Sequence, residues 1–288
     1  MHIDVEKRNK ALKKMVLFTL IMAIICLIYM LVTSYLSEKS KFVIDLSTLE
    51  LVQLEEPEDG DPIAVIDTSL GEIRAVLYPE YAPNTVANFT ELAESGYYDN
   101  TYVFHSEKGV YSAAGCPNKN GDLPDDFDKS RELVERELHQ NLWPFKGALC
   151  SMTTTFKQSF GQRFTGGGTY YCGSRFALLN TVDITDEMKQ QIFDLSNSKK
   201  LTDAFAEKGG VPNFSQQIVV FGQVYEGLDI VEQLSELKVE ENEGSTKIPV
   251  DDVMINSIKI DKYSSEKQKK KRLNKFLCDY YCAENKPF

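Results

Sequence analysis

Cysteine and histidine can bind metals or carry out redox chemistry, and this chain has six of the first and three of the second. Cys278 and Cys282 are separated by three residues, a spacing that could supply two thiolates to a metal ion. Such a site needs further ligands, and the sequence contains neither a second pair of this kind nor a motif around His139. We therefore expect no metal ion and no cofactor.

Charged residues are distributed unevenly along the chain. The net charge is −11, yet residues 1–14 carry five Lys and Arg against two acids, and residues 266–288 carry seven against three. The acidic segment between them lacks the basic surface that nucleic-acid binding needs, so we expect no nucleic-acid partner. The basic run 267–275 is either a solvated tail or a site for anionic lipid or wall polymer.

A hydrophobic segment near the N-terminus predicts membrane insertion. Residues 15–37 contain no charged side chain, and as a helix they would span about one hydrocarbon core. A cleaved signal peptide is the alternative, but the run is long and residues 33–37 offer no good small-x-small cleavage site. Basic residues crowd the N-terminal flank, so the positive-inside rule predicts a cytoplasmic N-terminus and an extracytoplasmic C-terminal part.

The rest of the chain alternates short β-prone runs with two main helical patterns. Runs at 63–68 and 72–78 flank Ser69-Leu70-Gly71, which predicts a hairpin, and a helix is expected between Pro83 and Gly96. Further strands are expected at 147–152, 174–179, 218–224 and 253–260, and further helices near 185–195, 201–205 and 227–234. Many short strands with few helices indicate a barrel or sandwich with helical caps.

Several segments of this region follow one another in a characteristic order. They are Thr68-Ser69-Leu70-Gly71-Glu72-Ile73, Ala82-Pro83-Asn84-Thr85-Val86-Ala87-Asn88-Phe89, Gly96-Tyr97-Tyr98-Asp99 and Val219-Val220-Phe221-Gly222-Gln223-Val224-Tyr225-Glu226-Gly227. They resemble the cyclophilin family of peptidyl-prolyl isomerases, over residues 63–261. The resemblance implies a mainly β fold, a closed eight-stranded antiparallel barrel capped by two helices, with a peptide groove on its outer surface.

The predicted organisation combines this fold with the membrane segment. It comprises a basic cytoplasmic tail (1–14), a transmembrane signal-anchor helix (15–37), an acidic linker (38–61), a cyclophilin-like domain (62–262) and a basic C-terminal tail (263–288). Segment 180–211 is longer than its counterpart in compact cyclophilins and predicts a helical insertion. It either roofs the groove, contacts a partner or is a surface elaboration.

The resemblance also assigns catalytic positions. The family's Phe-His-Arg motif reads Phe104-His105-Ser106 here, so Ser106 replaces the Arg whose guanidinium donates to the substrate around the prolyl bond. In this family the histidine is mainly structural, so His105 is expected to be a satisfied internal histidine rather than an acid or base. The family's Gly-Ser-Gln-Phe-Phe resembles residues 173–177, which places Arg175 at the Gln. Arg175 either partly replaces the missing guanidinium or forms an ordinary salt bridge.

Other motifs assign the substrate-binding positions. Phe-Met-Ile-Gln-Gly-Gly resembles residues 110–115, Trp-Leu-Asp-Gly-Lys-His resembles residues 213–218, and Met-Ala-Asn falls near residues 152–154. The predicted substrate-binding residues are Val110, Tyr111, Ala113, Thr153, Phe176, Asn213, Phe214 and Ile218.

Cys150 and Cys172 lie near the ends of a loop that joins two strands which this fold would pair. An outward-facing disulfide and a pair of free buried thiols are both compatible with that placement.

The function that these features predict is a membrane-anchored, extracytoplasmic peptidyl-prolyl isomerase that assists folding of exported proteins. Its ligands would be proline-containing segments of those proteins. Isomerisation needs only rotation about a partial double bond, so no covalent nucleophile is required. Because Ser106 replaces the catalytic Arg, we expect weak activity. The alternative is a non-catalytic module that holds proline-containing segments or another partner.

Overall fold

The computed structural model describes residues 5–39, 44–124, 131–159, 162–165, 167–240, 246–266 and 268. Contacts between residues divide the chain into two units. One comprises Met1–Val43 with Phe160–Gly167, and the other comprises Ile44–Ser159 with Gly168–Phe288. The basic tail predicted at 263–288 therefore lies almost wholly outside the described residues, as do Cys278 and Cys282.

The first unit consists mainly of helix α1 (Val5–Lys39), with the single turn α4 (Gln162–Thr165) assigned to the same unit. Within α1, the segment Lys7–Val32 is long and apolar enough to cross a membrane. Its side chains are exposed along its whole length. The expected apolar helix is thus present, while its orientation in a membrane stays a prediction.

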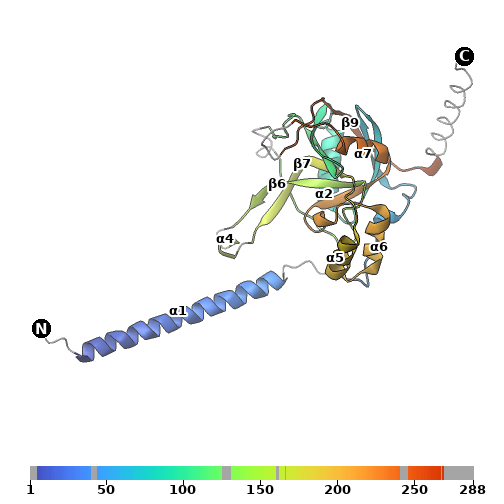
Figure 1. Cartoon of the computed structure of the whole chain (residues 1–288). Coiled ribbons are helices and arrows are strands. Elements are labelled where there is room, and N and C mark those ends of the chain that lie inside the picture. Colours follow the sequence, from blue (N-terminus) through green and yellow to red (C-terminus); the bar gives the residue numbers. More distant parts are fainter. Residues whose placement is uncertain are drawn as a thin grey trace, which may run out of the picture. The chain divides into compact units, whose positions relative to one another are not determined.

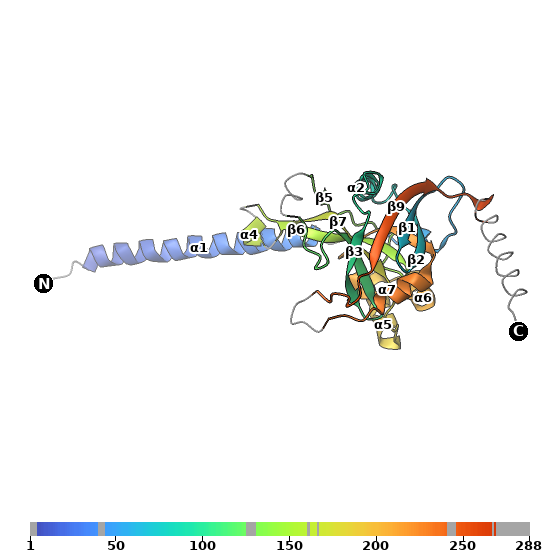
Figure 2. The ribbon, with the colours of Figure 1, turned by 90° about the horizontal axis from the view of Figure 1, so that it is seen from above.

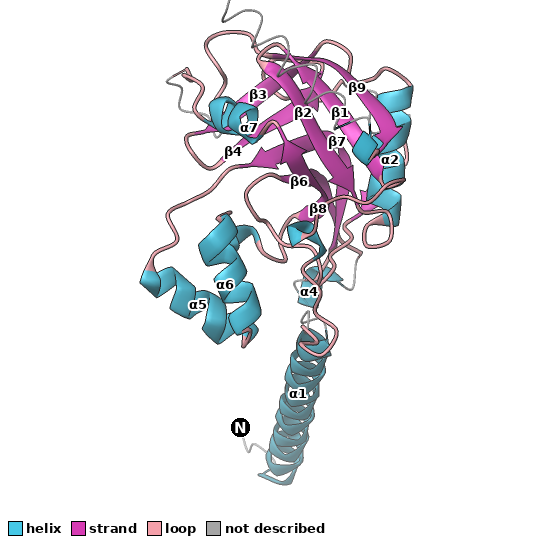
Figure 3. Cartoon of the chain, turned by 90° about the vertical axis from the view of Figure 1, so that its right-hand side faces the viewer, coloured by secondary structure: helices cyan, strands magenta, loops and turns pink. Residues whose placement is uncertain are grey.

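The second unit is built around a β-barrel. Its strands are β1 (Pro62–Thr68), β2 (Gly71–Leu77), β3 (Thr101–Glu107), β4 (Tyr111–Cys116), β5 (Val134–Glu135), β6 (Ala148–Lys157), β7 (Thr169–Leu179), β8 (Val219–Glu226) and β9 (Met254–Lys262). They pair in the order β4-β3-β9-β1-β2-β8-β6-β7-β5, and a further β4–β7 pairing closes the ring. All of these pairs are antiparallel. Among the described residues, eight strands thus form a closed barrel (Figure 3), and β5 pairs with β7 at its side.

The first hairpin shows how local sequence specifies part of this barrel. Strands β1 and β2 pair from Ile63 opposite Val76 to Thr68 opposite Gly71. The Thr68 hydroxyl donates to the Gly71 carbonyl oxygen at 2.7 Å and accepts from the Gly71 N–H at 3.1 Å. Gly71 has a φ of 145°, which a side chain would disfavour. The predicted hairpin is confirmed.

Two helices cover the barrel, α2 (Pro83–Glu94) and α7 (Leu228–Ser235) (Figure 1). Helix α2 starts with Pro at its first position, and the distant Glu137 carboxylate accepts from the Thr85 N–H at 2.8 Å. This acceptor satisfies a free N–H of the first helical turn. The buried face of α2 includes Phe89 and Leu92, which join the main core. The barrel capped by two helices is therefore confirmed.

The predicted insertion contains helices α5 (Asp186–Ser196) and α6 (Lys199–Lys208). Their starts are capped by the Thr185 and Ser198 hydroxyls, which accept from N–H groups three residues ahead. Their buried residues form a second cluster, distinct from the barrel core, with Leu49, Leu51, Trp143 and Phe145. None of the buried members of this cluster is a predicted groove residue. The insertion thus packs on the segment before β1 and on residues 143–145.

Part of the predicted linker 38–61 also belongs to this cluster. Leu49 and Leu51 are buried, and residues Val52–Leu54 form the short 3-10 helix η1. The Gln53 amide donates to the Trp143 carbonyl oxygen at 2.9 Å. These contacts differ from the solvated linker that the acidic composition suggests, because the apolar residues of this segment find partners on the insertion.

The longest strands are β6 and β7, and their far ends run beyond the rest of the barrel (Figure 2). Cys150 lies on β6 opposite Ala177, whereas Cys172 lies on β7 opposite Thr153. Both thiols are buried and free. Of the two alternatives left open by the sequence, the structure has the free thiols.

Candidate functional site

The predicted catalytic segment lies on three neighbouring strands. In the β3–β4 pair, His105 is opposite Ala113 and Ser106 is opposite Ser112, while Ala113 is in turn opposite Ala177 of β7. Directly opposed residues share a face of a sheet, and successive residues alternate between faces. His105 and Ser106 therefore project to opposite sides of the barrel wall.

Ser106 is on the side of the wall that faces α7. Its hydroxyl donates to the Leu234 carbonyl oxygen at 2.9 Å, and the residue is 1% exposed. The Ser106 backbone N–H donates to the Lys247 carbonyl oxygen at 3.0 Å. A side chain that begins at this position points at a helix end, away from the outer surface.

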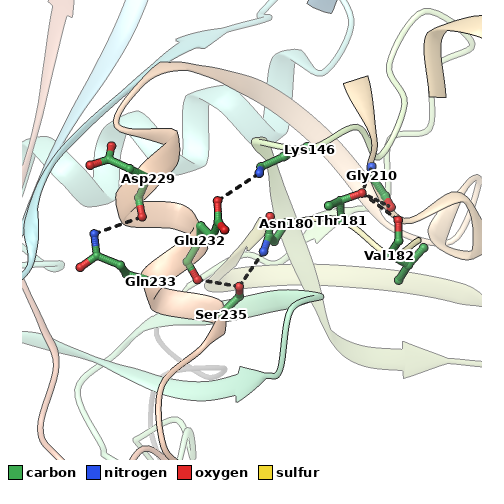
Figure 4. A network of polar contacts seen from close by, with 9 residues as sticks. All are labelled: Lys146, Asn180, Thr181, Val182, Gly210, Asp229, Glu232, Gln233 and Ser235. Atoms are coloured by element: carbon green, nitrogen blue, oxygen red, sulfur yellow. Dashed lines mark hydrogen bonds and ion pairs between the residues drawn. The ribbon is translucent and has the colours of Figure 1, made fainter. Parts of the chain in front are cut away.

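Further hydrogen bonds hold the same end of α7 to the barrel. The Asn180 amide nitrogen donates to the Ser235 hydroxyl at 2.9 Å, and that hydroxyl donates to the Glu232 carbonyl oxygen at 2.8 Å (Figure 4). The Lys146 ammonium lies 3.3 Å from the Glu232 carboxylate in the same network. Ser106 is thus one member of a set of groups that join α7 to β3 and to the end of β7.

His105 is on the other side of the wall, with the predicted groove residue Tyr111. The two rings are stacked, with centroids 5.1 Å apart and an interplanar angle of 22°. The Lys247 N–H donates to the His105 Nδ1 at 2.9 Å, and the Lys247 ammonium pairs with the Glu107 carboxylate at 2.6 Å. Burial is the main cause that lowers the pKa of His105, so the neutral ring is favoured.

Tyr111 connects His105 to a second predicted groove residue, Phe214. Their rings meet edge to face with centroids 5.7 Å apart. Phe214 ends the short 3-10 helix η2 (Pro212–Phe214). Tyr111, Phe214 and Ile218 are all partly buried and pack against the main core. Burial raises the pKa of the Tyr111 phenol, so this group stays neutral near neutral pH.

The backbone beyond Phe214 supports the sequence correspondence in this loop. Gln216 has a φ of 60°, in the left-handed region that favours glycine. The family motif has Gly at that position. The loop therefore keeps the family's backbone turn with a larger residue, and its Oε1 is buried without a hydrogen-bond partner among the described residues.

Phe176 is not brought to this cluster. It is 1% exposed and lies in the barrel core, where its ring contacts Phe89 at 5.7 Å and Tyr98 at 5.5 Å, edge to face in both cases. Its neighbour Ala177 shares a row with Ala113 and His105. The resemblance placed Phe176 in the proline pocket, but the pleat of β7 turns it inward.

Arg175 precedes Phe176 on β7 and projects to the opposite face from it. Its Nη1 donates to the Gly121 carbonyl oxygen at 3.1 Å, and its Nε is buried without a hydrogen-bond partner among the described residues. The guanidinium is thus held by the loop after β4. No ion pair of Arg175 is described, which disfavours the ordinary salt bridge within the described chain.

The remaining predicted positions lie around this region with different exposure. Ala113 is fully buried, Val110 is half-buried, and Thr153 and Asn213 are exposed. The structure thus brings together Tyr111, Ala113 and Phe214 with His105, whereas Ser106 and Phe176 point elsewhere. Sequence reasoning missed Lys247, because nothing in a residue 142 positions after His105 signals a backbone contact with its ring.

The fold and this site define a class of protein: a closed antiparallel barrel capped by two helices, with an aromatic cluster and a buried imidazole on its outer face. A family model described as cyclophilin type peptidyl-prolyl cis-trans isomerase/CLD matches residues 63–166 and 185–260. Because the match covers more than half of the chain, the chain belongs to this family.

Curated relatives agree with this assignment. Proteins named "Putative peptidyl-prolyl cis-trans isomerase" from Staphylococcus aureus (strain USA300) and Staphylococcus epidermidis (strain ATCC 12228) are each 28% identical over 207 residues, which is 72% of this chain and 95% of the relative. A crystal structure of a cyclophilin type peptidyl-prolyl cis-trans isomerase from Cryptosporidium parvum is 19% identical, with a TM-score of 0.50, and the match covers 71% of this chain and 99% of that one. This structural likeness supports the fold.

Proposed function

We propose that this chain is a membrane-anchored, extracytoplasmic cyclophilin-type isomerase with weak activity toward proline-containing segments of exported proteins. The observation that carries the proposal is the contact between Tyr111 and Phe214 on the outer face of the barrel. A partly exposed aromatic pair accommodates a proline ring by van der Waals contact and burial of apolar surface. Val110, Ile218, Thr153 and Asn213 would contact the flanking residues of the ligand.

Weak activity follows from the loss of the family's catalytic guanidinium. Ser106 replaces the family's Arg and its hydroxyl is engaged with α7, so it supplies no donor to a ligand on the outer face. Losing one preorganised donor commonly lowers a rate about 10²–10³-fold. Arg175 is the proposed source of a partial replacement, through a guanidinium that already donates one hydrogen bond to Gly121.

The second candidate is a module that binds proline-containing segments without isomerising them. The aromatic pair would remain useful for binding when the charged donor is lost, because apolar burial contributes equally to both isomers. The two candidates differ in turnover, and they share the same groove.

The test is exchange NMR on the purified full chain in detergent micelles, with the peptide succinyl-Ala-Ala-Pro-Phe-amide. Isomerase activity predicts cis–trans exchange faster than in a micelle control. Binding that shifts peptide resonances without faster exchange would support the module instead, and absence of both effects would reject the groove as a proline site.

Membrane anchoring needs its own test. The apolar helix α1 and the basic residues before it support an N-terminus in the cytoplasm and a domain outside it. Protease added to intact cells or spheroplasts should remove the domain. Complete protection there, with digestion after lysis, would contradict the proposed orientation.

A further inference from the structure

The hydrogen bond to His105 determines which of its ring nitrogens carries the proton. Lys247 contributes a backbone N–H, which can only donate, and it lies 2.9 Å from Nδ1. Nδ1 must therefore present its lone pair. In the neutral ring the proton is then on Nε2, so His105 is fixed in one tautomer.

The resulting Nε2–H has no hydrogen-bond acceptor among the described residues. His105 is 6% exposed, and its Nε2 is buried without a hydrogen-bond partner among the described residues. An unsatisfied buried donor destabilises a fold. Such groups are rare in native proteins, so each one needs a physical explanation.

The surroundings of this nitrogen belong to the proposed proline site. The imidazole stacks on Tyr111, which contacts Phe214, and its partner across the sheet is Ala113, the position at which the family resemblance places a Gln. An alanine leaves this part of the wall without a side-chain donor. His105 places a polar side chain beside the aromatic pair, and Glu107, which lies opposite Tyr111, is paired with the Lys247 ammonium.

We propose that the Nε2–H of His105 donates a hydrogen bond to the prolyl amide of the bound ligand, on the face where the family's guanidinium would act. This inference rests on the proposed function. No covalent bond forms or breaks, because the reaction is rotation about the amide bond. As conjugation is lost, the prolyl nitrogen gains a lone pair that accepts a hydrogen bond, and a donor that meets it stabilises the twisted state.

The proposal also explains why activity should be weak and still measurable. A neutral N–H forms a weaker hydrogen bond than a charged guanidinium, by roughly a factor of two in strength. The Lys247 N–H and the Tyr111 ring nevertheless hold the imidazole in one orientation, which reduces reorganisation during catalysis. Ligand binding must uncover Nε2, because His105 is 6% exposed in this structure.

The first experiment uses the wild-type full chain in detergent micelles with histidine labelled with ¹⁵N. Titration with succinyl-Ala-Ala-Pro-Phe-amide should shift the Nε2–H resonance of His105 in a saturable manner, while the resonances of His139 stay in place. A purely structural histidine would not respond. An unchanged Nε2–H resonance at saturating peptide would overturn the proposal.

The second experiment replaces the ring and removes the donor. His105→Phe keeps an aromatic ring for stacking on Tyr111, and we expect cis–trans exchange of the bound peptide to fall by at least tenfold. His139→Phe is the matched control, because His139 also accepts a backbone N–H at Nδ1, at 3.2 Å, and also contacts a tyrosine ring, Tyr81 at 4.7 Å. It should leave exchange unchanged.

The outcomes separate this inference from the proposed function. If the wild type accelerates exchange and folded His105→Phe does so within twofold, the His105 donor is rejected while the isomerase remains. If the wild type neither binds nor isomerises the peptide, the proposed function fails and the donor role fails with it. If His105→Phe does not fold, the wild-type titration alone decides.

Discussion

The polar groups on the two sides of strand β3 differ in their hydrogen bonds. On the side facing α7, the Ser106 hydroxyl donates to a helix carbonyl group and the Asn180 amide nitrogen donates to Ser235, although the Asn180 Oδ1 has no hydrogen-bond partner among the described residues. On the outer side, His105 Nε2 is buried without a partner among the described residues. Arg175 Nε, on β7, is likewise unpaired within the described chain.

This difference distinguishes two kinds of polar group. The first kind makes hydrogen bonds within the protein and stabilises the fold, and the second kind has no partner there and remains available for a ligand. A hydrogen bond made inside the protein contributes about 1 kcal/mol to stability, whereas an unmade one opposes folding. Groups of the first kind are expected to affect unfolding when changed. Groups of the second kind are expected to affect binding and turnover.

The largest expected effect comes from Ser106→Arg. The family resemblance alone predicts a gain of activity from this change, but the structure directs the new side chain toward α7, where a much larger, charged side chain would have to be buried. We expect the free energy of unfolding to fall by at least about 3 kcal/mol. For a domain of this size that corresponds to a melting temperature lower by about 6–12 °C.

Circular dichroism of the full chain during heating measures this effect. An unchanged melting temperature together with faster isomerisation would show that residue 106 faces the ligand. It would contradict the assignment of residue 106 to the side of β3 that faces α7.

The neighbouring change His105→Arg places the same guanidinium on the outer side. Because a charged donor stabilises the developing lone pair more strongly than a neutral one, we expect isomerisation to increase by about tenfold. Loss of the acceptor for the Lys247 N–H should make the protein slightly less stable. Exchange NMR and thermal unfolding measure the two effects, and a decrease in exchange would indicate that the Lys247 contact or the imidazole itself is needed.

Arg175→Gln should have a smaller effect on turnover. The guanidinium already donates to the Gly121 carbonyl oxygen, which limits its reach toward a ligand. We expect exchange to fall by less than tenfold, which is less than about 1.4 kcal/mol in activation free energy. Complete loss of activity would instead identify Arg175 as the main replacement for the missing Arg.

The smallest expected effect concerns pH. Burial, the largest cause, and Lys247 lower the pKa of His105, while Glu107 opposes them. The unfolded chain therefore binds this proton more readily than the folded chain, so the contribution of His105 to stability is complete above about pH 6.5 and is lost as the pH falls through the folded pKa. Urea unfolding of wild type between pH 7 and pH 5 should show a steeper loss than His105→Phe. An equal loss of unfolding free energy with pH in the two proteins would contradict this role of His105. His139, whose pKa is also lowered, is present in both proteins and does not affect the difference between them.

Sequence alone predicted the fold because its signals are local. Ser69-Leu70-Gly71 between alternating runs is sufficient for the first hairpin, and Pro83 with Gly96 sets the limits of helix α2. The apolar residues 15–37 predict a long helix for the same reason. Such patterns depend only on residues that are close in sequence. The order of the motifs was enough to indicate the closed barrel.

The polar site depended on the tertiary structure. A motif match places residue 106 at a catalytic position, but one step along a strand reverses the direction of a side chain, and β3 has a register irregularity between Val103 and His105. That irregularity is compatible with the outward direction of His105 and the inward direction of Ser106. The tautomer of His105 depends on Lys247, and the place of Phe176 depends on Phe89 and Tyr98, which are remote in sequence. Composition and local spacing determine which elements form, whereas the face that each side chain occupies is decided only when distant strands pair.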